Sequence, residues 1–158
     1  MFALAPLVLT ACGDGGAGSR DVEASQSNQR WELRLRIPGE VRSGEMTAVE
    51  LSLKNVSDET SRAHTDCISW FDLIVLNEDG GQVFDWRDYV IETEYKGVHP
   101  ECPLQLNELE PGETLEQTVS FQVDVRGQYT VRGLAPPEEV SNGSRLVHLS
   151  LSVQVRAK

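Results

Sequence analysis

Hydrophobic and polar residues alternate with a period of two along most of the chain after residue 30. Segment 31–37 carries apolar side chains at every odd position and charged side chains between them, and it ends at Pro38 and Gly39. A strand with one buried face produces this alternation, because successive side chains point to opposite faces of a sheet. The pattern predicts no helix. It predicts seven strands, at residues 31–37, 47–53, 70–76, 82–86, 115–123, 127–131 and 147–155.

Turn sequences separate these strands. Asp79-Gly80 supplies the positive φ that a tight hairpin needs, and Pro111-Gly112 marks a second turn. Short alternating strands joined by turns are typical of an all-β, immunoglobulin-like antiparallel β-sandwich, here of seven to eight strands. Tyr129 lies near the start of the penultimate strand, where such folds carry a tyrosine corner; a plain core or edge tyrosine is the alternative.

The N-terminal segment is apolar but short. Residues 2–10 are almost entirely apolar, whereas a membrane-spanning helix needs roughly 20 such residues. The run ends in Leu9-Thr10-Ala11-Cys12, which is similar to the lipobox of bacterial lipoproteins. We therefore expect Cys12 to carry a lipid, with a buried N-terminal strand and an ordinary cysteine as the alternative. No Lys or Arg precedes the run, so either the true start lies upstream or the charged region is degenerate.

The lipobox divides the chain into three parts. Residues 1–11 are the predicted signal peptide, and residues 12–29 are the lipidated cysteine and a flexible tether rich in Gly, Ser, Ala and Asp. Residues 30–158 are long enough for one sandwich domain with its own core. This division predicts a protein of the cell envelope, anchored to a membrane by the lipid on Cys12 and facing outside the cytoplasm.

Charge narrows the range of partners. The formal net charge is -11 at pH 7. Nucleic-acid binding requires a clustered basic face, so we expect no nucleic-acid partner. The net negative charge also argues against electrostatic adhesion to anionic lipid. We therefore expect any membrane attachment to occur through a lipid on Cys12.

Three segments together resemble the BsuPI family of intracellular proteinase inhibitor-like β-sandwiches. They are Leu53-Lys54-Asn55-Val56-Ser57, the hairpin 71–86, and residues 109–114 with Gly127-Gln128-Tyr129-Thr130-Val131. The resemblance implies an immunoglobulin-like fold and proteinase inhibition. The chain departs from the family in its expected export and in an insertion between Trp86 and Leu104. We carry over no inhibitory residue.

The remaining cysteines form a natural pair. With Cys12 lipidated, Cys67 and Cys102 are left, and an oxidising compartment favours a disulfide between them. Closing that loop stabilises the fold by roughly 3–4 kcal/mol in the chain-entropy model. The alternative is a zinc or copper site, because His64 and His99 each precede a cysteine by three positions.

Catalytic chemistry is sparse. The chain contains no nucleophile elbow, P-loop or His-Glu-x-x-His motif, and we expect no enzymatic activity, no cofactor and no metal. Asp72, Asp79 and Asp85 surround one hairpin and could chelate calcium. The simpler interpretation is that they are turn and solvent-facing residues.

The insertion after the hairpin is the best candidate for recognition. Trp86, Arg87, Tyr89 and Tyr95 are of the residue types that anchor protein interfaces. Alternation over 89–95 equally predicts one more strand whose aromatics cover the core.

Two functional hypotheses follow from these features. The favoured one is a lipid-anchored, extracytoplasmic protein-binding module whose partner is an envelope protein, with a protease as one candidate. The alternative is a structural or accessory subunit of an envelope assembly without inhibitory activity.

Overall fold

The computed structural model describes residues 20–103, 105–136 and 149–158. Cys12 and the predicted signal peptide lie outside these residues, as does His148. The described part contains ten strands and one helix. They are β1 (Val22–Ser27), β2 (Trp31–Ile37), β3 (Thr47–Asn55), β4 (Ser61–Thr65), β5 (Asp72–Leu76), β6 (Gln82–Asp85), α1 (Trp86–Glu94), β7 (Gln105–Leu109), β8 (Thr114–Phe121), β9 (Gly127–Leu134) and β10 (Ser150–Ala157).

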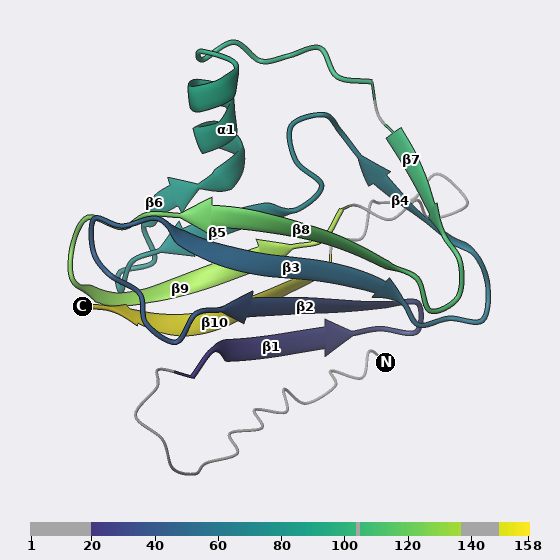
Figure 1. Ribbon diagram of the computed structural model, residues 1–158, viewed down its shortest axis with the longest axis horizontal. Helices are drawn as coiled ribbons and strands as arrows, with labels where there is room; N and C mark the ends of the chain where they lie inside the picture. Colours follow the sequence, from purple (N-terminus) through teal and green to yellow (C-terminus); the bar gives the residue numbers. More distant parts are fainter. Residues whose placement is uncertain (1–19, 104, 137–148) are drawn as a thin grey trace.

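Two four-stranded antiparallel sheets face each other, which confirms the predicted sandwich (Figure 1). Sheet A has the order β1-β2-β3-β8, and sheet B has the order β10-β9-β5-β6. Strands β4 and β7 form a separate two-stranded ribbon. The alternation predicted for 31–37 is observed: its odd positions are buried, and Leu33, Leu35 and Ile37 are fully enclosed. The facing core positions of sheet B include Leu73, Val75 and Val131.

Strand β1 corrects the expected tether. Residues 12–29 were expected to be flexible, yet Val22–Ser27 pairs antiparallel with β2 over its whole length. Its side chains are mostly polar because β1 is an edge strand: only Val22 and Ala24 contact the core, and both are half-buried. Strand β1 is therefore held by its backbone hydrogen bonds to β2 and by these two side chains. It lacks the continuous apolar alternation from which the other strands were predicted. The ordered sandwich therefore begins before residue 30.

The predicted turn chemistry is confirmed in the β5–β6 hairpin. Gly80 adopts φ +79°, and the backbone N–H of Asn77 donates to the carbonyl of Gly81 at 2.8 Å. The hydroxyl of Tyr129 donates to the carbonyl of Val125 at 2.6 Å. This upstream backbone bond is the one that a tyrosine corner makes.

The two long edges of the sandwich differ. At one edge β1 lies beside β10. At the opposite edge α1 contacts β5, β6 and β8, so it is separated from β1 by the width of the sheets (Figure 1).

Candidate functional site

The four predicted partner-binding residues all belong to α1 or its C-terminal boundary. The expected extra strand over 89–95 is wrong, because Trp86–Glu94 is helical. Only Ile91 of the alternating set is buried, and it shares the buried side of the helix with its neighbour Val90. Adjacent buried residues fit a helix and break a strand alternation.

Both ends of α1 are fixed by local sequence. Asp85 is the N-cap, and its Oδ1 accepts the backbone N–H of Arg87 at 2.9 Å and that of Asp88 at 3.2 Å. At the other end Lys96 and Gly97 adopt positive φ, and the N–H of Gly97 donates to the carbonyl of Ile91 at 3.0 Å. A glycine in this conformation is a common helix stop.

The underside of α1 packs on the loop that precedes β5. Val90 and Ile91 form a small hydrophobic cluster with Ile68, and Trp86 and Tyr95 pack against its margin. This cluster is separate from the main core. Helix α1 is therefore held by its own apolar contacts with loop 66–71.

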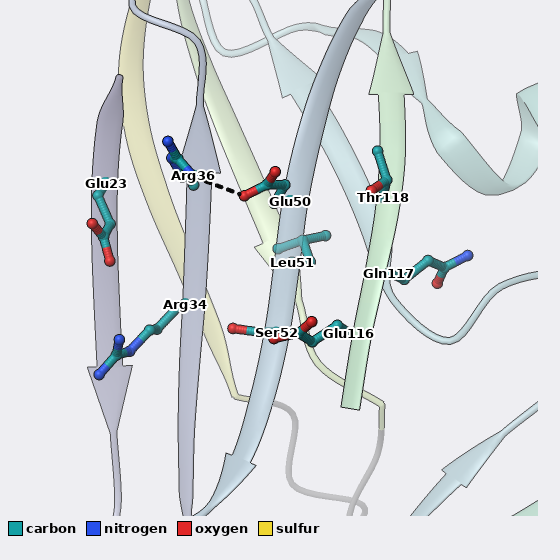
Figure 2. Close-up of a pocket in the computed structure, with 9 residues that line it drawn as sticks. All are labelled: Glu23, Arg34, Arg36, Glu50, Leu51, Ser52, Glu116, Gln117 and Thr118. Atoms are coloured by element: carbon teal, nitrogen blue, oxygen red, sulfur yellow. Dashed lines mark hydrogen bonds and ion pairs between the residues drawn. The ribbon is translucent and has the colours of Figure 1, made fainter. Parts of the chain in front are cut away.

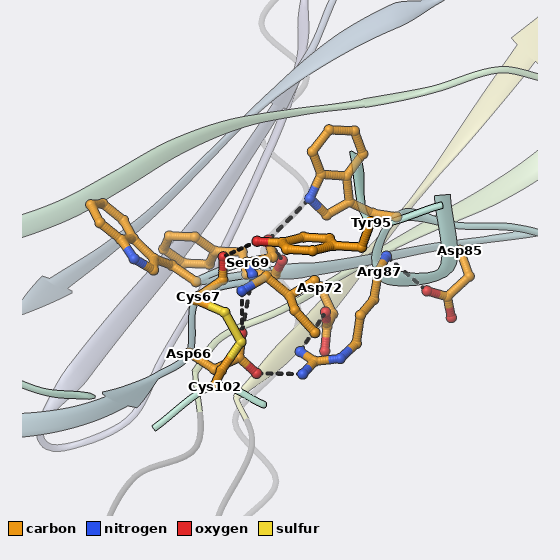
Figure 3. Close-up of polar contacts among 12 residues, drawn as sticks. Asp66, Cys67, Ser69, Asp72, Asp85, Arg87, Tyr95 and Cys102 are labelled. Atoms are coloured by element: carbon orange, nitrogen blue, oxygen red, sulfur yellow. Dashed lines mark hydrogen bonds and ion pairs between the residues drawn. A yellow bond between two sulfur atoms is a disulfide. The ribbon is translucent and has the colours of Figure 1, made fainter. Parts of the chain in front are cut away.

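Polar contacts hold the same two segments together (Figure 3). The guanidinium of Arg87 donates to the Asp66 carboxylate, and the indole Nε1 of Trp86 donates to Ser69 Oγ at 3.0 Å. The hydroxyl of Tyr95 donates to the carbonyl of Cys67 at 3.4 Å. Three of the four predicted partner-binding residues thus fasten the helix to the sandwich.

The predicted disulfide is present. Cys67 and Cys102 are joined, with their Cα atoms 5.6 Å apart, and the bond ties loop 66–71 to the segment that follows α1. Helix α1 therefore lies within the loop of chain that the Cys67–Cys102 disulfide closes.

The Asp66–Arg87 pair is ionised at neutral pH. Burial on its own would raise the pKa of Asp66, but hydrogen bonds from Arg87 and from the backbone N–H groups of Ser69 and Ile68 lower that pKa below its ordinary value. Burial likewise would lower the pKa of Arg87, but its bond to Asp66 and the nearby carboxylates raise it. The ion pair is partly shielded, with side-chain exposures of 34% for Arg87 and 17% for Asp66.

Gln117 is a positioning residue that the sequence pattern did not identify. It occupies an inward position of β8, and its Oε1 accepts the backbone N–H groups of Trp70 and Phe71 at 2.9 and 3.1 Å. It also accepts from Ser69 Oγ at 3.2 Å. The available signal was a polar residue at an inward position between Leu115 and Val119, since an amide that is partly withdrawn from solvent needs hydrogen-bond partners.

Tyr89 is the predicted partner-binding residue that remains exposed. Its ring stacks on Trp86 with centroids 5.7 Å apart and lies 5.6 Å from the ring of Phe84. Of the eight exposed large hydrophobic residues in the described structure, four come from the segment between residues 70 and 98. They are Trp70, Val83, Tyr89 and Val98. We call α1 with the exposed parts of Val83 and Phe84 the α1 surface.

The metal alternatives lack support in the described residues. Both cysteine sulfurs of the His-x-x-Cys pair are in the disulfide. Asp85 caps the helix, Asp79 lies in the hairpin turn and Asp72 lies 3.9 Å from Arg87, so the three aspartates have separate roles. No group of three or more His, Cys, Asp or Glu that could hold a metal ion occurs in the part of the chain that the structure describes.

A concave surface lies on the outer face of sheet A (Figure 2). It encloses about 410 Å³ and is lined mainly by charged and hydroxyl side chains. Arg36 pairs there with Asp21 at 2.6 Å and with Glu50 at 3.3 Å, and Arg34 pairs with Glu32 at 3.2 Å. Because its cations are already paired and none of its lining residues is an exposed large hydrophobic, this face resembles a solvated sheet surface.

Comparisons with known proteins define the class as a β-sandwich domain. No protein-family model matches the chain, and no curated protein matches it. The crystal structure of the C-terminal domain of Wzt is similar over 89% of this chain and 81% of that one, with 12% identity and a TM-score of 0.51. A CARDB domain from Pyrococcus furiosus, solved in complex with di-metal ions, is similar over 92% of this chain and 95% of that one, with 11% identity and a TM-score of 0.44.

The Wzt likeness supports the immunoglobulin-like β-sandwich fold and leaves function open, because one fold hosts many functions. The resemblance to the BsuPI family stays a prediction. Within the described residues, no helix is both long and apolar enough to cross a membrane.

Proposed function

We propose that the chain is a protein-binding module of the cell envelope that presents the α1 surface to a protein partner. The observation that carries this proposal is the exposed, stacked ring of Tyr89 on a helix that is fastened at its underside and within a disulfide-closed loop. Exposed aromatic residues in fixed positions are the usual anchors of protein interfaces.

The contacts that fix α1 against loop 66–71 favour binding without a large conformational change. Arg87, Trp86 and Tyr95 each bond to loop 66–71, so the helix is ordered before a partner arrives. Ordering before association lowers the entropic cost of binding. Helix α1 is thus a rigid platform for Tyr89.

The position of the predicted anchor fits this proposal. We propose that Cys12 carries a lipid, ten residues before Val22 at the start of β1. Strand β1 forms one edge of the sandwich and α1 covers the other. A domain held through β1 therefore keeps the α1 surface on the edge farthest from its attachment strand (Figure 1).

Site-specific photocrosslinking tests the binding proposal. A photoreactive phenylalanine analogue replaces Tyr89 in the full chain, expressed in a bacterial envelope, and the matched control replaces Thr118 on the outer face of sheet A. We expect one protein, identified by mass spectrometry, to crosslink at position 89 and not at 118. Equal crosslinking at the two positions, or none at 89, would contradict the proposal.

The lipid anchor has its own test. The Cys12→Ser chain should lose incorporation of a labelled fatty acid and partition into the aqueous phase of a detergent separation, whereas the parent chain should follow the membrane. Mass spectrometry of the parent should show removal of residues 1–11. Unlabelled parent protein would contradict the anchor and leave the α1 proposal to its own assay.

Proteinase inhibition is the narrower form of the binding proposal, and the BsuPI resemblance is its support. A panel of proteases, assayed with the full chain and with its Tyr89→Ala variant, decides it. Inhibition that the substitution weakens would establish the inhibitor. Undiminished protease activity across the panel would leave a binding or accessory module without inhibitory function.

A further inference from the structure

The exposed side of α1 combines the Tyr89 ring with carboxylates at helical spacing. Val90 and Ile91 are buried on one side of the helix, so Asp88, Tyr89 and Glu92 lie on the opposite, exposed side. Asp88 and Glu92 are four residues apart, which places their like charges one above the other on the helix. Glu92 is three residues from Tyr89 and is therefore its neighbour on the helix surface, and Asp88 lies one turn before Glu92.

Asp88 in the first turn suits the helix dipole, but the other features of this arrangement oppose helix stability. Like charges at this spacing destabilise a helix. Glu92 and Glu94 also occupy the C-terminal turn, where the helix dipole favours cations, and the last turn contains no basic residue. Violations of such local rules are expected at functional or strained sites.

On two other surfaces, arginine side chains pair with nearby carboxylates. Arg36 on sheet A pairs with Asp21 and Glu50, and Arg62 pairs with Glu108 across the β4–β7 ribbon at 2.9 Å. Among the described residues, Asp88, Glu92 and Glu94 form no ion pair within 4 Å, and the segment 78–101 contains seven acidic and two basic residues. The negative charge of the exposed α1 side is thus available to a partner.

We propose that the α1 surface binds an arginine- or lysine-bearing segment of its protein partner, with a cationic side chain against the Tyr89 ring and between Asp88 and Glu92. A tyrosine ring attracts a cation over its face, and flanking carboxylates add ion pairs. Anionic membranes and nucleic acids would be repelled. The inference rests on the proposed function and adds the chemistry of the partner.

A defined peptide provides the test. The probe is a short peptide of alternating arginine and leucine, and its counterpart has neutral citrulline at each arginine. NMR titration of the full chain should show the arginine peptide shifting the backbone signals of residues 88–93, with binding weakened at about 0.3 M salt. The citrulline peptide should leave these signals unchanged.

Matched variants separate a specific site from general acidity. Asp88→Asn with Glu92→Gln should weaken binding of the arginine peptide about fivefold, the loss expected from two exposed ion pairs. Glu45→Gln with Glu116→Gln removes the same charge elsewhere and should change the affinity less than about twofold.

Three results would overturn the inference: no shift at millimolar peptide, equal weakening by both double variants, or shifts centred on sheet A. If position 89 still crosslinks to a protein in any of these cases, the protein-binding function is retained and the basic chemistry of the partner is rejected. Absence of that crosslink would reject the proposed function itself.

Discussion

At the scale of single residues, Asn55 shows how one buried side chain holds several loops. It is fully buried, and its Nδ2 donates to the carbonyls of Glu59 and Leu109 at 2.8 Å each. Its Oδ1 accepts the N–H of Ser57 at 3.0 Å and the hydroxyl of the same residue at 2.7 Å. The end of β3, the turn after it and the end of β7 therefore share one amide.

Replacement of Asn55 by alanine should lower the free energy of unfolding by about 2–4 kcal/mol, because several buried polar groups lose their partners. Asn77→Ala is the matched control. Its Oδ1 also accepts two backbone N–H groups, but in an exposed turn, so the expected loss is about 1 kcal/mol or less. Urea unfolding of both variants measures the difference, and equal losses would contradict the role of burial.

Asp66 gives the attachment of α1 a dependence on pH. Its pKa is lowered in the folded state, so its contribution to stability is complete above the ordinary carboxyl pKa near 3.8 and is lost as the pH falls through the folded value. We expect Asp66→Asn to reduce stability at pH 7 and to flatten the loss of stability below pH 4. Glu108→Gln, which removes one member of an exposed ion pair, is the matched control and should change stability at pH 7 by about 1 kcal/mol or less. Urea unfolding between about pH 2 and 7 measures the stability of both variants. If Asp66→Asn and the parent chain lose stability equally as the pH falls, Asp66 does not cause this pH dependence.

Residue type could be predicted from the sequence, but residue contacts could not. Trp86, Arg87 and Tyr95 were chosen as interface residues because of their chemistry, yet each uses its polar atoms to hold α1 against loop 66–71. Only Tyr89 keeps an exposed ring. The difference depends on residues of a distant segment, which no local pattern contains.

At the scale of elements, strands with one apolar face could be predicted and strands without one could not. Segment 31–37 is fully alternating, whereas β4 and β7 are short and largely polar. They exist because they pair with each other, over five residue pairs from Ser61–Leu109 to Thr65–Gln105. Helix α1 was missed for a related reason: its N-cap Asp85 and its stop at Gly97 were present in the sequence, but a chance alternation over 89–95 favoured a strand.

The disulfide should contribute to stability and to the order of α1. Cys67→Ser with Cys102→Ser opens a loop of 35 residues and should lower the free energy of unfolding by about 3–4 kcal/mol. Amide exchange at Val90 and Ile91 should accelerate more than in the main core, because these residues pack within the closed loop. Tyr95→Phe removes one partly exposed hydrogen bond and should cost about 1 kcal/mol or less. Unchanged exchange in α1 would show that packing alone orders it.

At the scale of the whole molecule, the sandwich depends on a close approach of its two sheets at Gly133 of β9. A Cβ placed there would lie 2.7 Å from Leu51 Cδ2 and 3.0 Å from Leu35 Cδ1, both on sheet A. The alternation of sheet A predicted that these leucines point inward, but it could not predict which residue of the other sheet they meet. The pairing of sheets is set by strands that are distant in sequence.

The contact between Gly133 and Leu51 can be tested with a double-mutant cycle, which measures the coupling between the two positions. Gly133→Ala should destabilise the fold by about 1–3 kcal/mol, because the new methyl group overpacks a region already filled by leucine side chains. In a Leu51→Val background the nearer obstruction is removed, so the same substitution should cost at least about 0.5 kcal/mol less. Gly127→Ala is the matched control, since its Cβ would meet only Tyr129 at 3.9 Å and should cost little. Urea unfolding of the four-member cycle measures the coupling; additive effects would mean that Gly133 and Leu51 do not meet across the core.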